Sequence, residues 1–469
     1  MTAPRAPLRV PWTALVLLAV AALFFARMRV RVDPDLFFHL KDGERVVRER
    51  ILPRTEAFSF TRAGRAMVAT EWLSSVSLYA AFRLGGYPAA AGLCVLMTVG
   101  ALGLAGLAGG EAPEPVRALA AALAAFGLFN FALAKVQCWT FLLFGLHLYW
   151  VRRWEEGAAW APWAMAASLA LWVNLHGGFM LGWGLLSVVC GLDFLRAPRA
   201  RALAPWALGT LACCLHPDGA AAFVYPLWFV FAPPAGRALI SEWRPLTFEP
   251  SALPYALLAA AALGAGVHRL RRRFPWPLLV LALGVMGAHE RKLLPYFALS
   301  ALAASLLAAA RARWARSPLC LAGALGVLLA VGALQAAEAR ALAPLGPVSD
   351  WQRAFPSGAA DYAAARLPGA RVFAPYKWGG YLLWRLGPRT KVFIDGRLDP
   401  YWTLLGDYET LSAARPGWRE LLDAYGVTAA ILPPASPLAR ALDSDPAWRA
   451  RGNDRVSVLY ARRRRSRPR

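Results

Sequence analysis

Long apolar runs alternate with short polar loops over most of the chain. The runs recur near the length that crosses about 30 Å of hydrocarbon, which is typical of a polytopic α-helical membrane protein. One run, 71–84, is ambiguous because it is short and carries Glu71 and Arg83 near its ends. We predict about eleven membrane-spanning helices, over 11–26, 87–109, 117–134, 138–151, 159–175, 178–195, 202–215, 252–267, 275–288, 293–310 and 318–337.

The pattern changes near residue 343. Turn residues there separate short apolar runs from helical stretches, and such alternation is typical of a small α/β domain. We expect strands within 371–374, 391–394, 428–433 and 456–461, and helices over 358–366, 376–386 and 416–425. The predicted parts are a bundle over 1–342, whose first outer loop (28–86) carries juxtamembrane helices, an α/β domain over 343–460 and a basic tail over 461–469.

Composition supports a membrane protein. The chain is 58% hydrophobic and 17% charged, whereas soluble domains carry about 25% charged residues. We attribute most of the net charge of +24 to cytoplasmic loops that set orientation, and not to nucleic acid. The six cysteines lie in apolar segments without metal-ligand spacing, so we interpret them as small buried hydrophobes.

Arginine placement indicates the orientation. If residues 71–84 do not cross the membrane, four arginine clusters lie on the same side as the N-terminus. The positive-inside rule assigns that side to the cytoplasm. If these residues cross, those clusters move outside. We therefore place 71–84 at the outer surface as a juxtamembrane helix, with residues 343–469 outside; the acidic loop 110–116 is an exception. The clusters lie within 152–153, 196–201, 269–273 and 311–316.

This topology also brings the unusual polar residues to the outer face. Polar groups at a bilayer boundary are costly unless they face water or each other, so their convergence predicts one shared cavity. The clusters are Asp33, Asp35 and His39; Lys135 and Gln137; Asn174 and His176; His216 and Asp218; Glu242 and Arg244; and residues 289–292.

The segment DPDLFFHL (33–40) carries the most suggestive chemistry. Two carboxylates flank a proline that fixes the backbone. Such a pair can hold a divalent cation such as Mg²⁺ or Mn²⁺, or one acid can act as a general base. The alternative is a cap of a helix over 36–49, where acids also suit the helix dipole. Either Asp35 or Asp33 can supply that cap. We assign the chemistry chiefly to Asp33, although one residue can serve both roles.

Asn174 and His176 lie in LWVNLHGGFMLG, where a helix meets the outer face. They can supply a hydrogen-bonding or proton-transfer pair in the cavity, or only hydrogen bonds between helices.

Cations on the outer side also need an explanation. Arg291 and Lys292 lie at an outer helix end, where a lipid phosphate or pyrophosphate would pair with them. The alternative is snorkelling toward headgroups. Lys135 and Arg244 are similar cases.

The sequence contains no P-loop, no GxGxxG after a strand, no HExxH and no GxSxG. It therefore gives no indication of ATP hydrolysis, a zinc protease or a serine hydrolase. The basic segment after Asp42 lacks the interleaved aromatics of a nucleic-acid surface.

A transporter or flippase of lipid-linked sugars would carry inverted repeats, and we find none. A ligase or polymerase of surface glycans and a non-catalytic membrane assembly factor are further alternatives.

Taken together, these segments resemble the C-type glycosyltransferase (GT-C) superfamily. The first outer loop with DPDLFFHLKDGERVVRER and TEWLSSVSLYAAFRLGG, followed by NLHGG, is similar to bacterial members related to the protein mannosyltransferases and aminoarabinose transferases. Residues 372–397 are similar to the oligosaccharyltransferase catalytic subunit around its Trp-Trp-Asp-Tyr-Gly motif. The matching residues here are 376–380, YKWGG, so Trp378 replaces the motif's aspartate, which argues against N-linked protein glycosylation. Asp395 and Arg397 then contact acceptor or sugar, or only end a strand.

The resemblance implies a glycosyltransferase of the bacterial inner membrane. It would take a sugar from a polyprenyl-phosphate donor and transfer it with inversion of the anomeric configuration. Asp33 is the expected catalytic acid, with Asp35 as its partner, and Asp33 takes the acceptor proton or orients the acceptor. A divalent cation at Asp33 and Asp35 is an option, since some branches of the superfamily need none. No other cofactor, no nucleic acid and no protein partner is indicated. Expected substrate-binding residues are His39, Glu71, Lys135, Asn174, His176, Arg244, Arg291 and Lys292.

Overall fold

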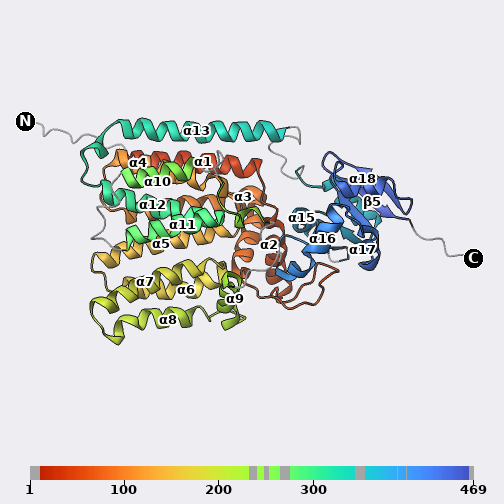
Figure 1. The fold of residues 1–469 in the computed structure, drawn as a ribbon, viewed down its shortest axis with the longest axis horizontal. Coiled ribbons are helices and arrows are strands. Elements are labelled where there is room, and N and C mark those ends of the chain that lie inside the picture. Colours follow the sequence, from red (N-terminus) through yellow and green to blue (C-terminus); the bar gives the residue numbers. More distant parts are fainter. Residues whose placement is uncertain are drawn as a thin grey trace, which may run out of the picture.

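The computed structural model describes residues 11–231, 240–247, 253–264, 275–343, 354–387, 389–397 and 399–463. Two predicted features, the last six residues of the basic tail and the arginines of 269–273, lie outside these ranges. Within them, long helices lie side by side in a bundle with a smaller α/β unit at one end (Figure 1).

The bundle places α13 along one edge and α8 along the other, with α2 across the end next to the α/β unit (Figure 1). Its core is apolar and aromatic and includes Phe141, Phe144 and Trp172. Its helices are α1 (Trp12–Val30), α2 (Asp35–Glu44), α3 (Trp72–Ala108), α4 (Glu114–Leu128), α5 (Gln137–Glu155), α6 (Ala161–Leu175), α7 (Phe179–Arg196), α8 (Ala204–Ala212), α9 (Ala220–Phe231), α10 (Leu253–Gly264), α11 (Trp276–His289), α12 (Leu294–Ala309) and α13 (Leu319–Leu342).

Five helices in the described part of the chain are long and apolar enough to cross a membrane. They cover Trp12–Val30, Trp72–Ala108, Phe179–Arg196, Arg291–Ala309 and Leu319–Leu342. Helices α6, α9 and α11 are apolar but shorter. The structure therefore has the helical character that the apolar pattern predicts.

Helix α3 combines the ambiguous run 71–84 with the apolar run that follows it. The two parts are separated by a kink at Gly85 and Gly86, where the backbone leaves the helical region and Gly86 has a φ of 64°. A positive φ is readily adopted by glycine because it has no Cβ. The kink makes the first part a helix with a direction of its own.

The first loop carries α2, which ends in a short π-helix over Arg45–Glu49. The alternative in which Asp35 caps this helix is wrong. Asp33 supplies the bond, because its Oδ1 accepts the backbone N–H of Asp35 at 2.9 Å, and Asp35 is the first helical residue. Asp33 thus accepts a hydrogen bond at the start of α2, one residue before its N-cap Pro34, and is also the candidate acid.

The α/β unit contains a five-stranded mixed sheet in the order β2-β1-β3-β5-β4. β1 pairs parallel with β2 and β3, whereas β5 pairs antiparallel with β3 and β4. The strands are β1 (Arg371–Phe373), β2 (Lys391–Val392), β3 (Ala429–Leu432), β4 (Trp448–Asn453) and β5 (Val458–Arg462). The helices are α14 (Ser357–Arg366), α15 (Tyr376–Leu386), α16 (Leu405–Ser412), α17 (Trp418–Ala424) and α18 (Pro437–Asp443).

The α/β unit packs directly on the first loop. Ser59 forms a parallel bridge with Val392 of β2. Phe37 of α2 makes edge-on ring contacts with Phe355 and with Tyr381 of α15, at centroid distances of 4.9 and 5.0 Å. These contacts bring the end of the sheet against the DPD segment, at the start of α2.

Candidate active site

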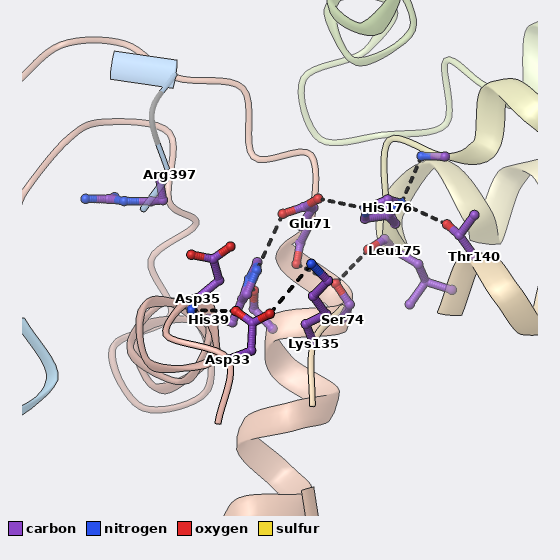
Figure 2. Close-up of polar contacts among 12 residues, drawn as sticks. Asp33, Asp35, His39, Glu71, Ser74, Lys135, Thr140, Leu175, His176 and Arg397 are labelled. Atoms are coloured by element: carbon purple, nitrogen blue, oxygen red, sulfur yellow. Dashed lines mark hydrogen bonds and ion pairs between the residues drawn. The ribbon is translucent and has the colours of Figure 1, made fainter. Parts of the chain in front are cut away.

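Asp33 lies in an ion-paired group between the first loop and the bundle. Lys135, in the loop before α5, places its Nζ 3.6 Å from Asp33 Oδ2 and 2.6 Å from Glu242 Oε1. The side chains of Asp33 and Lys135 are 7% and 9% exposed, whereas that of Glu242 is 38% exposed. One nearly buried ammonium therefore compensates one buried and one partly exposed carboxylate. Figure 2 shows Asp33, Asp35 and Lys135 converging.

Asp35 lies on the other side of Asp33 and is covered by the α/β unit. A Cβ on Gly396 would overlap Asp35 Oδ1, so the turn after β2 touches this carboxyl group. Burial raises the pKa of Asp35 well above its usual range, and the negative charge of Asp33 adds to the rise. The two acids therefore differ, since Asp33 is ion-paired whereas the charged form of Asp35 is disfavoured.

A second group surrounds Glu71, at the start of α3. Its Oε2 lies 3.6 Å from His39 Nε2, and its Oε1 lies 3.4 Å from His176 Nε2 (Figure 2). The Nδ1 atoms of the two imidazoles contact Ser75 Oγ at 2.9 Å and Thr140 Oγ1 at 2.8 Å. The carboxylate is thus held between two oriented rings.

Burial dominates the protonation equilibria around Glu71. It lowers the pKa of His39 and of His176 to about 3, so both rings are neutral near pH 7. It raises the pKa of Glu71 to about 7, although the positive charge of Lys135 opposes the rise. The Lys135 charge lowers the pKa of Glu242 despite burial. A carboxyl group that titrates near neutral pH suits acid–base chemistry.

Asn174 makes contacts that hold the loop and the bundle together. It accepts the indole N–H of Trp72 at 2.8 Å and donates to the carbonyl of Leu215 at 2.9 Å. His216 and Asp218 form hydrogen bonds with the backbone of Ala69 in the first loop. These contacts match the interhelical alternative and position Glu71, two residues from Ala69.

The predicted cations Arg244, Arg291 and Lys292 lie around a loop over residues 240–247. Arg291 donates to the Pro245 carbonyl and to Thr247 Oγ1, at 3.0 and 2.7 Å, and its backbone N–H bonds the Arg244 carbonyl at 3.2 Å. Lys292 Nζ lies 2.8 Å from the centroid of the Trp243 ring. Arg291 and Lys292 therefore hold the segment that presents Glu242.

Asp395 and Arg397 form a buried pair at the end of β2. Arg397 donates to both carboxylate oxygens of Asp395, at 2.9 and 2.6 Å, and its Nη2 lies 2.6 Å from Glu56 Oε2. The hydroxyl of Tyr401 donates to Asp395 at 2.8 Å. The geometry favours the interpretation that Asp395 and Arg397 only end a strand, because their charged groups bind each other and Glu56 and so hold the turn against Asp35.

The donors near Asp33 do not complete a divalent-cation site. Among the described residues, no three His, Cys, Asp or Glu side chains converge as metal ligands. The Lys135 ammonium instead lies beside Asp33 and Glu242. We derive no step through a metal, and the Mg²⁺ or Mn²⁺ at Asp33 and Asp35 stays a prediction.

Sequence reasoning grouped Glu242 with the outer polar clusters but did not include it among the site residues. Thr140 and Ser75, which contact the two imidazoles, were missed altogether. Each lies within an apolar helix, and only the fold brings it to a ring nitrogen.

No family model matches the sequence, and no curated protein matches it. Solved structures do match. The archaeal oligosaccharyltransferase AglB from Archaeoglobus fulgidus, in complex with an inhibitory peptide and a dolichol-phosphate, superposes with a TM-score of 0.56 at 13% identity, covering 90% of this chain and 69% of that one. ArnT from Cupriavidus metallidurans bound to undecaprenyl phosphate gives a TM-score of 0.53 at 15% identity, covering 96% and 98%.

The chain therefore shares its fold with AglB and ArnT. The apo form of ArnT matches as well, with a TM-score of 0.51 at 15% identity over 96% of this chain and 97% of that one. The resemblance drawn from the first loop and the NLHGG segment is thereby confirmed at the level of the fold. The coverage extends over both the bundle and the α/β unit.

Proposed function

We propose that this chain is a glycosyltransferase that moves a sugar from a polyprenyl-phosphate or polyprenyl-pyrophosphate donor to an acceptor outside the cytoplasm, such as a lipid, a glycan or a protein. The observation that carries the proposal is the ion-paired group of Asp33, Lys135 and Glu242. It lies at one end of a GT-C-type bundle, beside a carboxyl group that titrates near neutral pH. The two structural neighbours with bound dolichol-phosphate and undecaprenyl phosphate support a lipid-linked donor.

The reaction proposed is an inverting displacement at the anomeric carbon. The acceptor's oxygen or nitrogen attacks, and the bond from carbon to phosphate oxygen breaks. Lys135 stabilises the charge that develops on the departing lipid phosphate, because a fixed ammonium in a dry site acts strongly on developing charge. Asp33 holds Lys135 in place and takes the acceptor proton or orients the acceptor.

The proposed setting is the bacterial inner membrane, crossed about eleven times. The N-terminus is cytoplasmic, residues 71–84 lie at the outer surface, and the domain over 343–460 is periplasmic or otherwise extracytoplasmic. Membrane lipids and the lipid-linked donor are the proposed partners, with no nucleic acid. Arg291, Lys292 and Asn174 support this site chiefly by holding its loops, and Arg244 is a proposed contact of the donor phosphate.

The test uses the full-length protein in lipid nanodiscs. It receives a mixture of synthetic undecaprenyl-phosphate-linked sugars and a membrane extract as acceptor, and mass spectrometry measures the release of undecaprenyl phosphate. Asp33→Asn is expected to reduce release to background, because the carboxylate beside Lys135 is lost, while native mass spectrometry still detects bound undecaprenyl phosphate. Glu44→Gln, which removes a carboxylate paired with Lys41 on the same helix, should keep full activity. Full activity of the Asp33 variant would refute the assignment.

A further inference from the structure

Of the carboxyl groups in the site, Asp35 is covered by the turn at Gly396 and Glu242 is paired with Lys135 at 2.6 Å. The other two, Asp33 and Glu71, have different surroundings. Asp33 Oδ1 accepts the N–H of Asp35 at 2.9 Å, and its Oδ2 faces Lys135 at 3.6 Å. Both of its oxygens are thus engaged, one of them by a cation, whereas the Glu71 oxygens face two neutral imidazoles. Its side chain is 7% exposed, whereas that of Glu71 is 30% exposed, so Glu71 is the more accessible of the two.

The protonation of His176 follows from its hydrogen bonds. Its Nδ1 accepts the backbone N–H of Gly178 at 3.0 Å, so the proton of the neutral ring lies on Nε2. Thr140 Oγ1 accepts the indole N–H of Trp172 at 3.0 Å and lies 2.8 Å from the same Nδ1. The Nε2–H therefore points at Glu71 Oε1, 3.4 Å away.

This arrangement also decides between two uses of the group. Two imidazoles and one carboxylate are a familiar ligand set for metals, but these three side chains do not converge as ligands, and a ring nitrogen that carries a proton cannot bind a metal. The backbone N–H of Gly178 fixes that proton on the nitrogen facing Glu71. The group is built to orient a carboxylate by hydrogen bonds.

We propose that Glu71 is the general base that removes the proton from the attacking acceptor, and that His176 and His39 are positioning residues. The proposal rests on the glycosyltransferase function proposed above. As the acceptor's O–H or N–H bond breaks, the proton passes to a Glu71 oxygen and the electron pair forms the new bond to the sugar. The old bond to phosphate breaks, and its electrons leave with the polyprenyl phosphate, whose charge Lys135 stabilises. Asp33 then acts by orientation and charge.

The proposal predicts a specific dependence on pH. A general base works in its deprotonated form, so turnover rises as pH increases through the pKa of Glu71, about 7, and levels off above it. Below that pKa turnover falls about tenfold per pH unit. The titratable and charged groups that act on Glu71, or on the two rings beside it, are Lys135, Asp42, Glu242, Lys292 and Arg397.

Asp42 provides a matched control. It is a buried acid of the same loop, and burial raises its pKa to about 7 as well. Glu71→Gln and Asp42→Asn each remove one carboxyl group that titrates near pH 7. A difference in turnover between the two variants therefore reports the role of Glu71 and not the loss of a charge.

The experiment measures the release of undecaprenyl phosphate between pH 5.5 and 8.5 in the nanodisc assay. Glu71→Gln should lower turnover about 10²–10⁴-fold and make the remaining rate independent of pH, with unchanged binding of undecaprenyl phosphate by native mass spectrometry. Asp42→Asn should keep the pH-dependent rise. The inference is overturned if the Glu71 variant keeps that rise or if the Asp42 variant loses it. Absence of turnover in the unsubstituted protein would instead contradict the proposed function.

Further variants keep the test decisive if Glu71→Gln does not fold. Glu71→Asp retains a titrating carboxyl group and should show a reduced rate with the pH-dependent rise intact; a flat profile contradicts the inference. His176→Gln keeps an N–H donor and should lose less than His176→Leu, with the loss in kcat and not in KM. Equal losses of kcat in the two His176 variants would contradict the positioning role of His176.

Discussion

At the scale of single residues, charged side chains in this protein serve either the chemistry or the architecture, and their partners decide which. Asp395 and Arg397 follow a predicted strand, and the sequence leaves open whether they contact substrate. In the structure Arg397 is buried between Asp395 and Glu56. Because a buried guanidinium needs its counter-charges, this pair holds the turn that covers Asp35.

A stability prediction follows for Asp395. Burial alone would raise its pKa, but the bonds from Arg397 and Tyr401 outweigh burial and lower it. A carboxyl whose folded pKa lies below the unfolded value of about 3.9 stabilises the fold above that pH and loses this contribution as pH falls through the folded pKa. Asp395→Asn should therefore cost about 3–5 kcal/mol at pH 7 and less near pH 3, measured by thermal unfolding.

The control for this substitution is Asp361→Asn. Asp361 is 60% exposed and pairs with Arg385 at the surface, so its removal should cost under about 1 kcal/mol. An equal loss of stability for Asp395→Asn at pH 3 and pH 7 would contradict the argument.

At the scale of elements, glycines allow the α/β unit to reach the site. In α15, a Cβ on Gly380 would lie 2.9 Å from the Pro34 carbonyl oxygen, and one on Gly379 would overlap the carbonyl of Ile394. In α2, a Cβ on Gly43 would overlap the backbone of Ser75 in α3. The Gly379–Gly380 pair in the motif that resembles the oligosaccharyltransferase thus has a packing role at this position.

Gly379→Ala should separate α15 from the turn at Asp395 and destabilise the protein by about 1–3 kcal/mol, as overpacking does. Turnover should fall with it, because the turn no longer covers Asp35. Gly406→Ala is the control, since a Cβ added at Gly406 would meet no atom within 4 Å, and it should be neutral or stabilising. Thermal unfolding and the nanodisc assay check both variants; equal behaviour of the two would refute the packing role.

The strands also show which elements the hydrophobic pattern of the sequence could predict. The predicted strands at 371–374, 391–394, 428–433 and 456–461 each overlap an observed strand, because each is a short apolar run bounded by turn residues. β4 was missed because only its first residue, Trp448, is buried. An edge strand exposed along its length has no apolar alternation to reveal it.

At the scale of the whole molecule, orientation was inferred from charge and is open to a direct test. Glu420 is exposed in the α/β unit, and Arg313 is exposed in the segment between α12 and α13. In a Cys214→Ser background, which removes the one free cysteine in the described part of the chain that is not buried, a membrane-impermeant maleimide should label Glu420→Cys in intact cells. Arg313→Cys should be labelled only after permeabilisation. The reverse pattern would invert the topology.

The sequence by itself predicted the apolar helices and the α/β unit and drew attention to the DPD segment, because apolar periodicity, turn residues and a local acid pair are properties of neighbouring residues. The tertiary structure alone decided which acid Lys135 pairs with, that Gly396 covers Asp35, and that His39 and His176 hold Glu71. Those contacts join residues about 30 to 360 positions apart in the chain. Burial and charge then set their protonation, and neither is visible until the chain is folded.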